Sequence, residues 1–168
     1  VAVIWMFHGT GGEADWFDSV EGNEWVGKAL ARGFGFISTE SINRVAEQWD
    51  NGSLQTGTNV DLARLYDLRA HLVGSTGMGY GTPLFSVGFS NGGSFASTFA
   101  EALYDWGWVI KGTIIHNSLM PLGTIGMDGA MVPTMWVLSE NDEAIDNSMT
   151  IEQYDDHVAL GRDVELLT

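Results

Sequence analysis

The residues with the clearest chemical potential lie in one stretch, Val87 to Ser97, which reads VGFSNGGSFAS. It places Ser90 between glycines in the order G-x-S-x-G. This order is typical of a nucleophile elbow, in which a strand, a strained turn and a helix lift the serine oxygen above a sheet. Gly88 and Gly92 stand where such a turn leaves no room for side chains, and Gly93 lets the helix start close to the strand. The stretch predicts Ser90 as a nucleophile; the alternative is a serine that only caps a helix after a glycine turn.

A serine that attacks a carbonyl needs backbone N–H groups to stabilise the oxyanion that forms. The N–H of Asn91 directly follows the serine and is the first expected donor. The second is expected from the stretch MFHGTGG, residues 6–12, where Thr10 is the candidate, with Gly11 behind it. The alternative for this stretch is a glycine turn that only connects two elements. Thr10 and Asn91 are therefore the predicted oxyanion-hole residues.

The serine also needs a base, and the base needs an acid that fixes its tautomer. In MWVLSENDEAIDN an apolar run ends at Ser139 and acidic residues follow. Because sites in α/β proteins form at the carboxyl ends of strands, Asp142 is the predicted catalytic acid. Asp146 and Glu140 are further candidates, and the alternative is that all three are solvated loop carboxylates in an acidic chain.

Alternating apolar and amphipathic segments predict the elements that must position these groups. Six short apolar runs predict strands at 1–7, 33–39, 83–89, 109–116, 133–139 and 164–168. The intervals predict helices at 21–32, 58–74, 91–106 and 148–161, the second of them capped by Thr58 or Asn59. Nearly continuous apolar strands separated by helices indicate an α/β protein with a mostly parallel sheet flanked by helices. We expect one domain over residues 1–168, incomplete at both ends because the sequence opens and stops in a strand.

Three motifs, HGTGG, GFSNGG and SENDEAI, occur in an order and context that resemble the α/β-hydrolase superfamily. The chain is most similar to its esterases, in particular the group with feruloyl esterases, polyhydroxyalkanoate depolymerases and dienelactone-hydrolase-like enzymes. The resemblance implies a serine hydrolase that cleaves carboxylic esters through an acyl-enzyme intermediate, without a metal or organic cofactor. It gives His8 a supporting role beneath the oxyanion loop. It also implies further strands before the first apolar run and a catalytic histidine on a loop after the last core strand.

Four histidines could in principle serve as the base. His8 belongs to the HG motif, and His71 lies in a predicted helix, where we expect it at the surface. His116 ends a predicted strand but precedes Asp142, against the family order. His157 follows Asp142 but lies in the helix at 148–161, where a position on the helix surface is the simpler interpretation. We therefore expect the triad histidine outside this sequence, with His116 and His157 as alternatives and the activity of these 168 residues uncertain.

Composition excludes several classes of partner and site. Asp plus Glu number 22 against 7 Lys plus Arg, a formal net charge of −15, which disfavours nucleic acid and anionic membranes. The absence of cysteine excludes thiolate metal sites and a cysteine nucleophile. The expected partner is a small-molecule or polymeric ester, and Trp16, Phe17 and Trp25 could line its pocket or serve only in packing. A serine peptidase, a thioesterase and a catalytically inactive binding domain of the same fold remain alternative functions.

Overall fold

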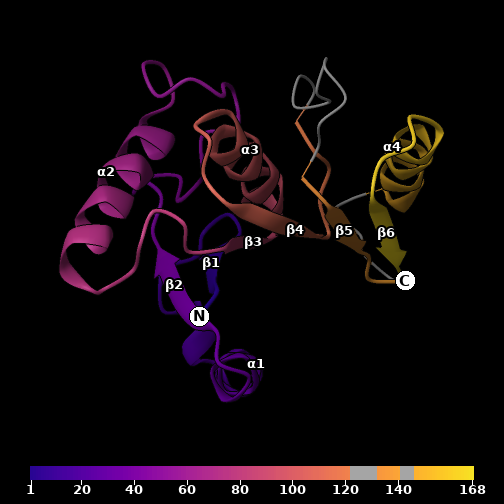
Figure 1. Ribbon diagram of the computed structural model, residues 1–168. Coiled ribbons are helices and arrows are strands. Elements are labelled where there is room, and N and C mark those ends of the chain that lie inside the picture. The colour runs from indigo at the N-terminus through magenta and orange to yellow at the C-terminus, as the bar shows by residue number, and fades with distance from the viewer. Residues whose placement is uncertain (122–131, 141–145) are drawn as a thin grey trace.

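The part of the chain that the structure describes is built around a six-stranded, entirely parallel β-sheet with the strand order β2-β1-β3-β4-β5-β6. The computed structural model describes residues 1–121, 132–140 and 146–168 (Figure 1). The strands are β1 (Val3–Phe7), β2 (Gly35–Thr39), β3 (Leu84–Phe89), β4 (Ile110–His116), β5 (Thr134–Val137) and β6 (Val164–Leu167). The predicted α/β class and parallel sheet are confirmed, and each observed strand lies within one of the six predicted segments.

In the described ranges, four α-helices flank the sheet. They are α1 (Val20–Ala31), α2 (Val60–Ser75), α3 (Asn91–Asp105) and α4 (Asn147–Ala159), and a short 3₁₀ helix, η1 (Trp16–Asp18), precedes α1. The helices α2, α3 and α4 lie on one face of the sheet and α1 lies on the other (Figure 1). Each α-helix was predicted within two residues of its observed ends, because apolar periodicity is strongest in long amphipathic segments.

The central strand β1 shows why its sequence is apolar throughout. Trp5 and Phe7 face α2 and α3, where Phe7 packs edge-on against Phe95 at a ring-centroid distance of 5.0 Å. Ile4 and Met6 point to the opposite face and pack in the cluster that includes Ala29 of α1. A parallel strand covered on both faces has no position for a polar side chain.

Side-chain caps set where the helices begin. Asn59, rather than Thr58, caps α2, since its side-chain oxygen accepts the N–H of Leu62 at 2.9 Å. Ser19 caps α1 in the same way by accepting the N–H of Gly22 at 3.1 Å. Each cap satisfies a backbone donor that has no partner inside the helix.

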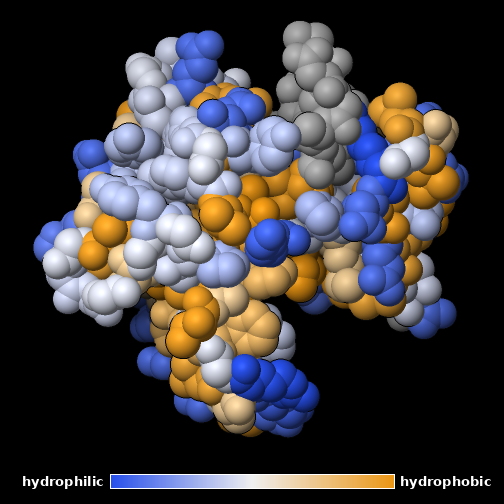
Figure 2. Space-filling model, in the orientation of Figure 1, coloured by the Kyte–Doolittle hydropathy of each residue, from blue (hydrophilic) through white to orange (hydrophobic). Residues whose placement is uncertain are grey.

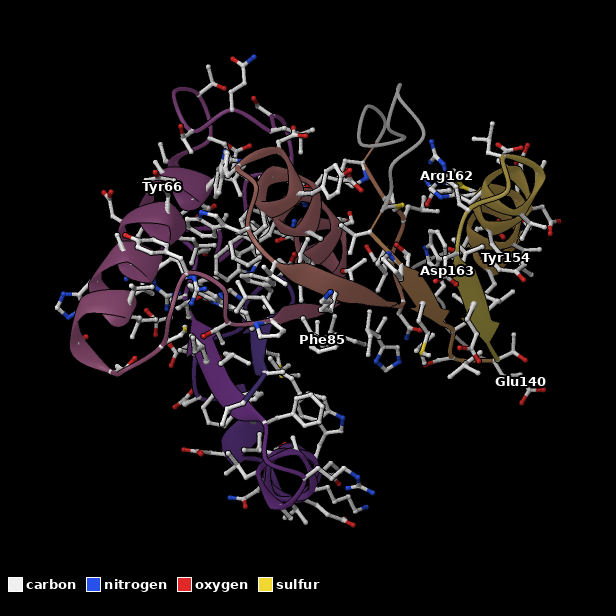
Figure 3. The ribbon with its side chains drawn as sticks, in the orientation of Figure 1. Tyr66, Phe85, Glu140, Tyr154, Arg162 and Asp163 are labelled. Atoms are coloured by element: carbon white, nitrogen blue, oxygen red, sulfur yellow. The ribbon has the colours of Figure 1, made fainter. Side chains whose placement is uncertain are left out.

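The α1 face of the sheet carries hydrophobic side chains beyond the area that α1 covers. Phe85 and Ile114 are partly buried there against the cluster of Ile4 and Met6. Figure 2 shows hydrophobic surface along the line of the sheet, and Figure 3 shows Phe85 on the side of α1.

A membrane crossing would need a longer and more apolar helix than any in the described part of the chain.

Candidate active site

Ser90 stands at the junction between β3 and α3 in a strained backbone conformation. Its φ of 53° and ψ of −127° are unusual for a residue with a side chain. The N–H of Ser90 donates to the carbonyl of His116 at 2.9 Å, and its own carbonyl accepts the N–H of Gly93 at 2.7 Å. Its hydroxyl makes no capping hydrogen bond to the helix, although Ser90 occupies the N-cap position. The structure therefore contradicts the alternative of a side-chain cap and leaves the hydroxyl for another task.

The glycines around Ser90 are required by close backbone approach. A Cβ atom at Gly88 would overlap the carbonyl group of Gly92. One at Gly92 would overlap carbonyl groups at the end of β1, and one at Gly93 would lie 2.9 Å from the Cβ of Ser118. The first turn of α3 thus presses against the ends of β1, β3 and the segment after β4, which is the tight packing that the sequence predicts for an elbow.

The loop that follows β1 lies directly beside the elbow. A Cβ atom at Gly9 would stand 3.4 Å from the Cβ of Ser90. Within the described ranges, the backbone N–H groups of Thr10 and Asn91 donate to no acceptor. Two donors without an acceptor in the described ranges, one on the residue after Ser90 and one on the loop beside it, are compatible with the predicted oxyanion hole. Their role in catalysis stays a prediction.

His8 is buried and both of its ring nitrogens are occupied. Its Nε2 accepts the N–H of Ser41 at 3.2 Å, so its proton is on Nδ1, which donates to the carbonyl of Gly9 at 2.7 Å. The His8 carbonyl accepts the indole N–H of Trp49 at 3.0 Å. His8 is therefore a structural support of the loop rather than an available base.

Of the other histidines, His116 lies nearest to the elbow along the sheet. Its ring packs edge-on against Phe89, the residue before Ser90, at a centroid distance of 5.1 Å. His71 is exposed on α2, as predicted. The backbone of His116 also accepts the N–H of Ser90, so its position relative to the serine is set by the β3–β4 pairing.

His157 does not lie on the surface of its helix, and that expectation was wrong. It is fully buried, with its ring edge-on to Trp136 of β5 at 5.2 Å and its Nδ1 3.4 Å from the guanidinium of Arg162. Figure 3 shows Arg162 beside α4. Burial, followed by the positive charge of Arg162, lowers the pKa of His157 to about 4. The helix turns this residue toward the sheet because that face must cover Trp136.

The predicted acid, Asp142, lies outside the described residues. Of the further candidates, Asp146 caps α4 by accepting the N–H of Ser148 at 2.9 Å, and its hydrogen bonds with Ser148 lower the pKa of its carboxyl group. Glu140 is exposed, and Figure 3 shows its side chain pointing away from the sheet. Asp146 is engaged in capping α4, and the Glu140 carboxylate is solvated. Neither carboxylate is placed here as the acid of a catalytic triad would be.

A segment absent from the sequence-based site encloses the elbow from the α2 side. We call residues Asn43–Asn51 the strap. Its Trp49 donates its backbone N–H to the side-chain oxygen of Asn91 at 2.7 Å, and its Glu47 accepts the N–H of Gly11 at 3.1 Å. The available signal was length, because the connection between β2 and α2 exceeds the roughly 15 residues above which loops are usually functional.

Other predicted or possible binding surfaces lie away from Ser90. Phe17 and Trp25 pack against Phe36 of β2, at 5.2 and 5.8 Å, so packing rather than a pocket at the elbow accounts for both. A hollow of about 570 Å³ is lined by Val3 and nine further residues at the amino-terminal end of the sheet, opposite the strand ends that carry Ser90. Among the residues described, His, Asp and Glu form no group of three or more suited to a metal ion.

Comparison with known proteins shows the fold. No family model and no curated protein matches the sequence. The solved structure of esterase PE8 matches with a TM-score of 0.71 and 17% identity, covering 99% of this chain and 81% of that one. The chain has an esterase-like α/β fold. Esterase Est22 matches with a TM-score of 0.59 and 14% identity, covering 99% of this chain and 62% of that one.

A third solved structure, Atu2452 from Agrobacterium tumefaciens, is of a protein of unknown function. It matches with a TM-score of 0.57 and 19% identity, and covers 99% of this chain and 79% of that one. At such identities the similarity establishes the architecture and suggests a hydrolase-type fold. The similarity does not identify the narrower esterase group that the motifs resemble, nor the reaction at Ser90. Both are argued below from the residues around Ser90.

Proposed function

We propose that this chain is a serine hydrolase that cleaves carboxylic esters, with Ser90 as its nucleophile. The observation that carries the proposal is the backbone of Ser90, held at a φ of 53° with a hydroxyl that does not cap the helix behind it. Such strain persists only where surrounding structure enforces it, and it clusters at functional sites. The N–H groups of Thr10 and Asn91, which have no acceptor among the described residues and belong to the loop beside Ser90 and to the residue after it, support an acyl-transfer function.

In the proposed reaction the Ser90 Oγ forms a bond to the ester carbonyl carbon while its proton passes to a histidine. The oxyanion would be held by the N–H groups of Thr10 and Asn91, each such donor contributing roughly 3 to 4 kcal/mol in characterised enzymes. Collapse breaks the bond to the alkoxy group, which leaves with the proton from the histidine, and water then releases the acid by the reverse sequence. Asp142 is the proposed acid that orients the histidine.

The surroundings of the histidines bear on which residue would act as the base. His8 has both ring nitrogens engaged, and His157 is buried against Trp136 and Arg162. His116 contacts the neighbour of the nucleophile and precedes Asp142 in sequence. A base supplied by His116, or by a residue outside these 168, is compatible with the proposal, and the two are separated by the activity of His116→Gln.

The deciding experiment is covalent labelling of the 168-residue chain with a fluorophosphonate, followed by intact mass and peptide mapping. We expect one adduct, located on Ser90, that is lost in Ser90→Ala. Ser75→Ala is the matched control, because Ser75 is exposed at the end of α2, and it should label as the unmodified chain does. Near-ultraviolet circular dichroism establishes that each variant is folded. A folded chain without an adduct would contradict activation of Ser90 by a base within these 168 residues, and would favour a base outside them or an inactive binding domain.

Substrate class is tested with acyl-matched 4-nitrophenyl ester, thioester and peptide substrates. We expect the ester to be cleaved with the highest kcat/KM. Preference for the thioester or the peptide would instead favour a thioesterase or a serine peptidase acting through the same residues. Saturable binding of an ester analogue without turnover would favour the inactive binding domain.

A further inference from the structure

We propose that the strap, Asn43–Asn51, is the positioning element that sets the two oxyanion donors relative to Ser90. The inference rests on the proposed function and deepens it. It assigns a positioning role to the main chain of Glu47 and to the indole of Trp49. Both residues lie outside the HGTGG and GFSNGG motifs. The strap contacts the segments of both predicted donors, and its own backbone is strained where it does so.

The first contact is with the residue that follows the nucleophile. The Oδ1 atom of Asn91 accepts the backbone N–H of Trp49 at 2.7 Å, and the Nδ2 atom of Asn91 faces the Trp49 carbonyl at 3.4 Å. The side chain of Asn51 donates to the carbonyl of Asn91 at 3.3 Å. The side chain and the carbonyl of Asn91 are thereby both held by the strap, which fixes the position of the residue that carries the first predicted donor.

The second contact is with the loop after β1. The Gly11 N–H donates to the carbonyl of Glu47 at 3.1 Å, and Gln48 Nε2 donates to the hydroxyl of Thr10 at 3.3 Å. The indole N–H of Trp49 donates to the carbonyl of His8 at 3.0 Å. Three consecutive strap residues therefore hold three parts of one short loop, including the residue whose N–H is the second predicted donor.

The strap is anchored on the side away from the elbow. The buried carboxylate of Asp61, in α2, accepts the N–H of Ile42 at 2.7 Å and that of Asp50 at 2.8 Å. These two acceptors fix the entry and the exit of the strap on a rigid helix. An isolated β-bridge between Asn43 and Gln48 closes the segment between them.

Backbone strain marks the position at which the strap meets the loop. Within the described residues, three that are not glycine have a positive φ, namely Glu47 at 49°, Ser90 at 53° and Asn117 at 48°. One is the proposed nucleophile, and Asn117 follows the residue whose carbonyl holds the Ser90 N–H. Strain of this kind costs of the order of 1 to 3 kcal/mol and persists only where the surroundings impose it. We infer that Glu47 is held in this conformation so that its carbonyl reaches Gly11.

The Glu47 side chain itself does little that would explain the strain. Its carboxylate lies 3.7 Å from a guanidinium nitrogen of Arg44, and both groups are partly exposed. Partly exposed pairs of this kind contribute little because water screens them. The main chain, rather than the charge, is therefore the functional part of Glu47, and this separates the proposal from a surface ion pair.

Substitutions at Glu47 test the proposal, since glycine, asparagine and valine all remove the carboxylate and differ strongly in backbone preference. Glycine and asparagine adopt a positive φ readily, whereas valine does so only under strain. With an ester substrate, we expect kcat of Glu47→Gly and Glu47→Asn within about threefold of the unmodified chain, and kcat of Glu47→Val lower by about 10- to 100-fold with KM nearly unchanged. An oxyanion contact acts in the transition state, so its loss lowers kcat rather than substrate binding. Equal kcat in all three variants would overturn the proposal.

A second variant guards against misfolding of Glu47→Val. Trp49→Phe keeps an aromatic ring against Phe95, with which Trp49 stacks at 4.7 Å, and removes the indole donor to His8 together with part of the buried ring volume. We expect a fall in kcat of about tenfold with little change in KM, by the same reasoning. Unchanged kcat in this variant would count against the strap.

A readout that needs no turnover separates the failure of this proposal from failure of the proposed function. Amide hydrogen exchange of Gly11, followed by NMR, reports its bond to Glu47 directly. We expect faster exchange in Glu47→Val than in Glu47→Gly, whether or not the chain hydrolyses esters. If the chain hydrolyses no ester but Gly11 still exchanges faster in Glu47→Val than in Glu47→Gly, the strap positions the loop and only the proposed hydrolase function is contradicted. Equal exchange in the two variants would overturn the positioning role.

Discussion

Asn117 and Ser139 hold each other through two hydrogen bonds of 2.8 Å each. The Oδ1 atom of Asn117 accepts the N–H of Ser139, and its Nδ2 donates to the Ser139 hydroxyl. The pair ties the end of β4 to the end of β5, and the Ser139 carbonyl accepts from Asn147 of α4 at 3.0 Å. Ser139 and Asn147 flank the segment that contains Asp142. The polar cluster thus fixes both ends of the segment that we propose to carry the acid.

A double-mutant cycle measures this pair. We expect Asn117→Ala to lower the free energy of unfolding by about 2 to 4 kcal/mol, because it removes two hydrogen bonds at a largely buried site and leaves an alanine at positive φ. Ser139→Ala removes one of the bonds and should cost about 1 to 2 kcal/mol. The double variant should show a coupling energy of roughly 1 kcal/mol in urea unfolding. Additive effects would contradict a direct interaction.

The contact of Gly92 with the end of β1 predicts that this position does not tolerate a methyl group. Gly92→Ala should lose at least about 3 kcal/mol of stability or fail to fold, since the new Cβ meets backbone rather than a movable side chain. Gly27→Ala is the control, as Gly27 lies in α1 with open space around it. It should gain about 0.5 to 1 kcal/mol by helix propensity. Thermal unfolding distinguishes the two, and similar Tm values would refute the packing argument.

Glu101 on α3 predicts a loss of stability at high pH. Burial, then the charge of Asp105, raises the pKa of Glu101 to about 7, above the 4.5 that is usual for a solvated glutamate. The folded chain therefore keeps a proton that the unfolded chain has released, and stability falls as pH rises through this window. Glu101→Gln should be more stable than the unmodified chain by roughly 3 kcal/mol at pH 8 and nearly equal at pH 4. Denaturant unfolding across pH, with exposed Glu152→Gln as control, measures the difference.

His157 predicts the opposite slope. Its pKa of about 4 lies below the value of 6.5 expected when unfolded, so the unfolded chain binds the proton first. Stability from this residue is present above pH 6.5 and is lost as pH falls toward 4, by roughly 3 kcal/mol in total. His157→Leu should remove that slope, whereas exposed His71→Leu should leave it in place. An NMR titration of His157 with a midpoint near 6.5 would show the argument to be wrong.

The local sequence patterns were enough to predict the helices and strands, which the structure confirms, and they predict Ser90 as the nucleophile. Uninterrupted apolar runs such as Val3–Phe7 predict strands covered on both faces, and the spacing of Gly88, Ser90 and Gly92 predicts the elbow, because both are local patterns. The sequence also limits the cap of α2 to Thr58 or Asn59, of which the structure shows Asn59. Local steric and hydrogen-bonding preferences suffice for features of this kind.

Which distant residues meet depends on the tertiary fold and could not be predicted from local patterns. Several contacts join segments that are far apart in the chain. Trp49 bonds to Asn91, and the Glu47 carbonyl accepts the N–H of Gly11. His157 is likewise buried against a distant strand. No periodicity encodes such contacts, because they depend on how the strap folds back over the sheet and on which face of α4 covers β5. Backbone groups must find partners once buried, and the available partner is set by packing rather than by sequence neighbours.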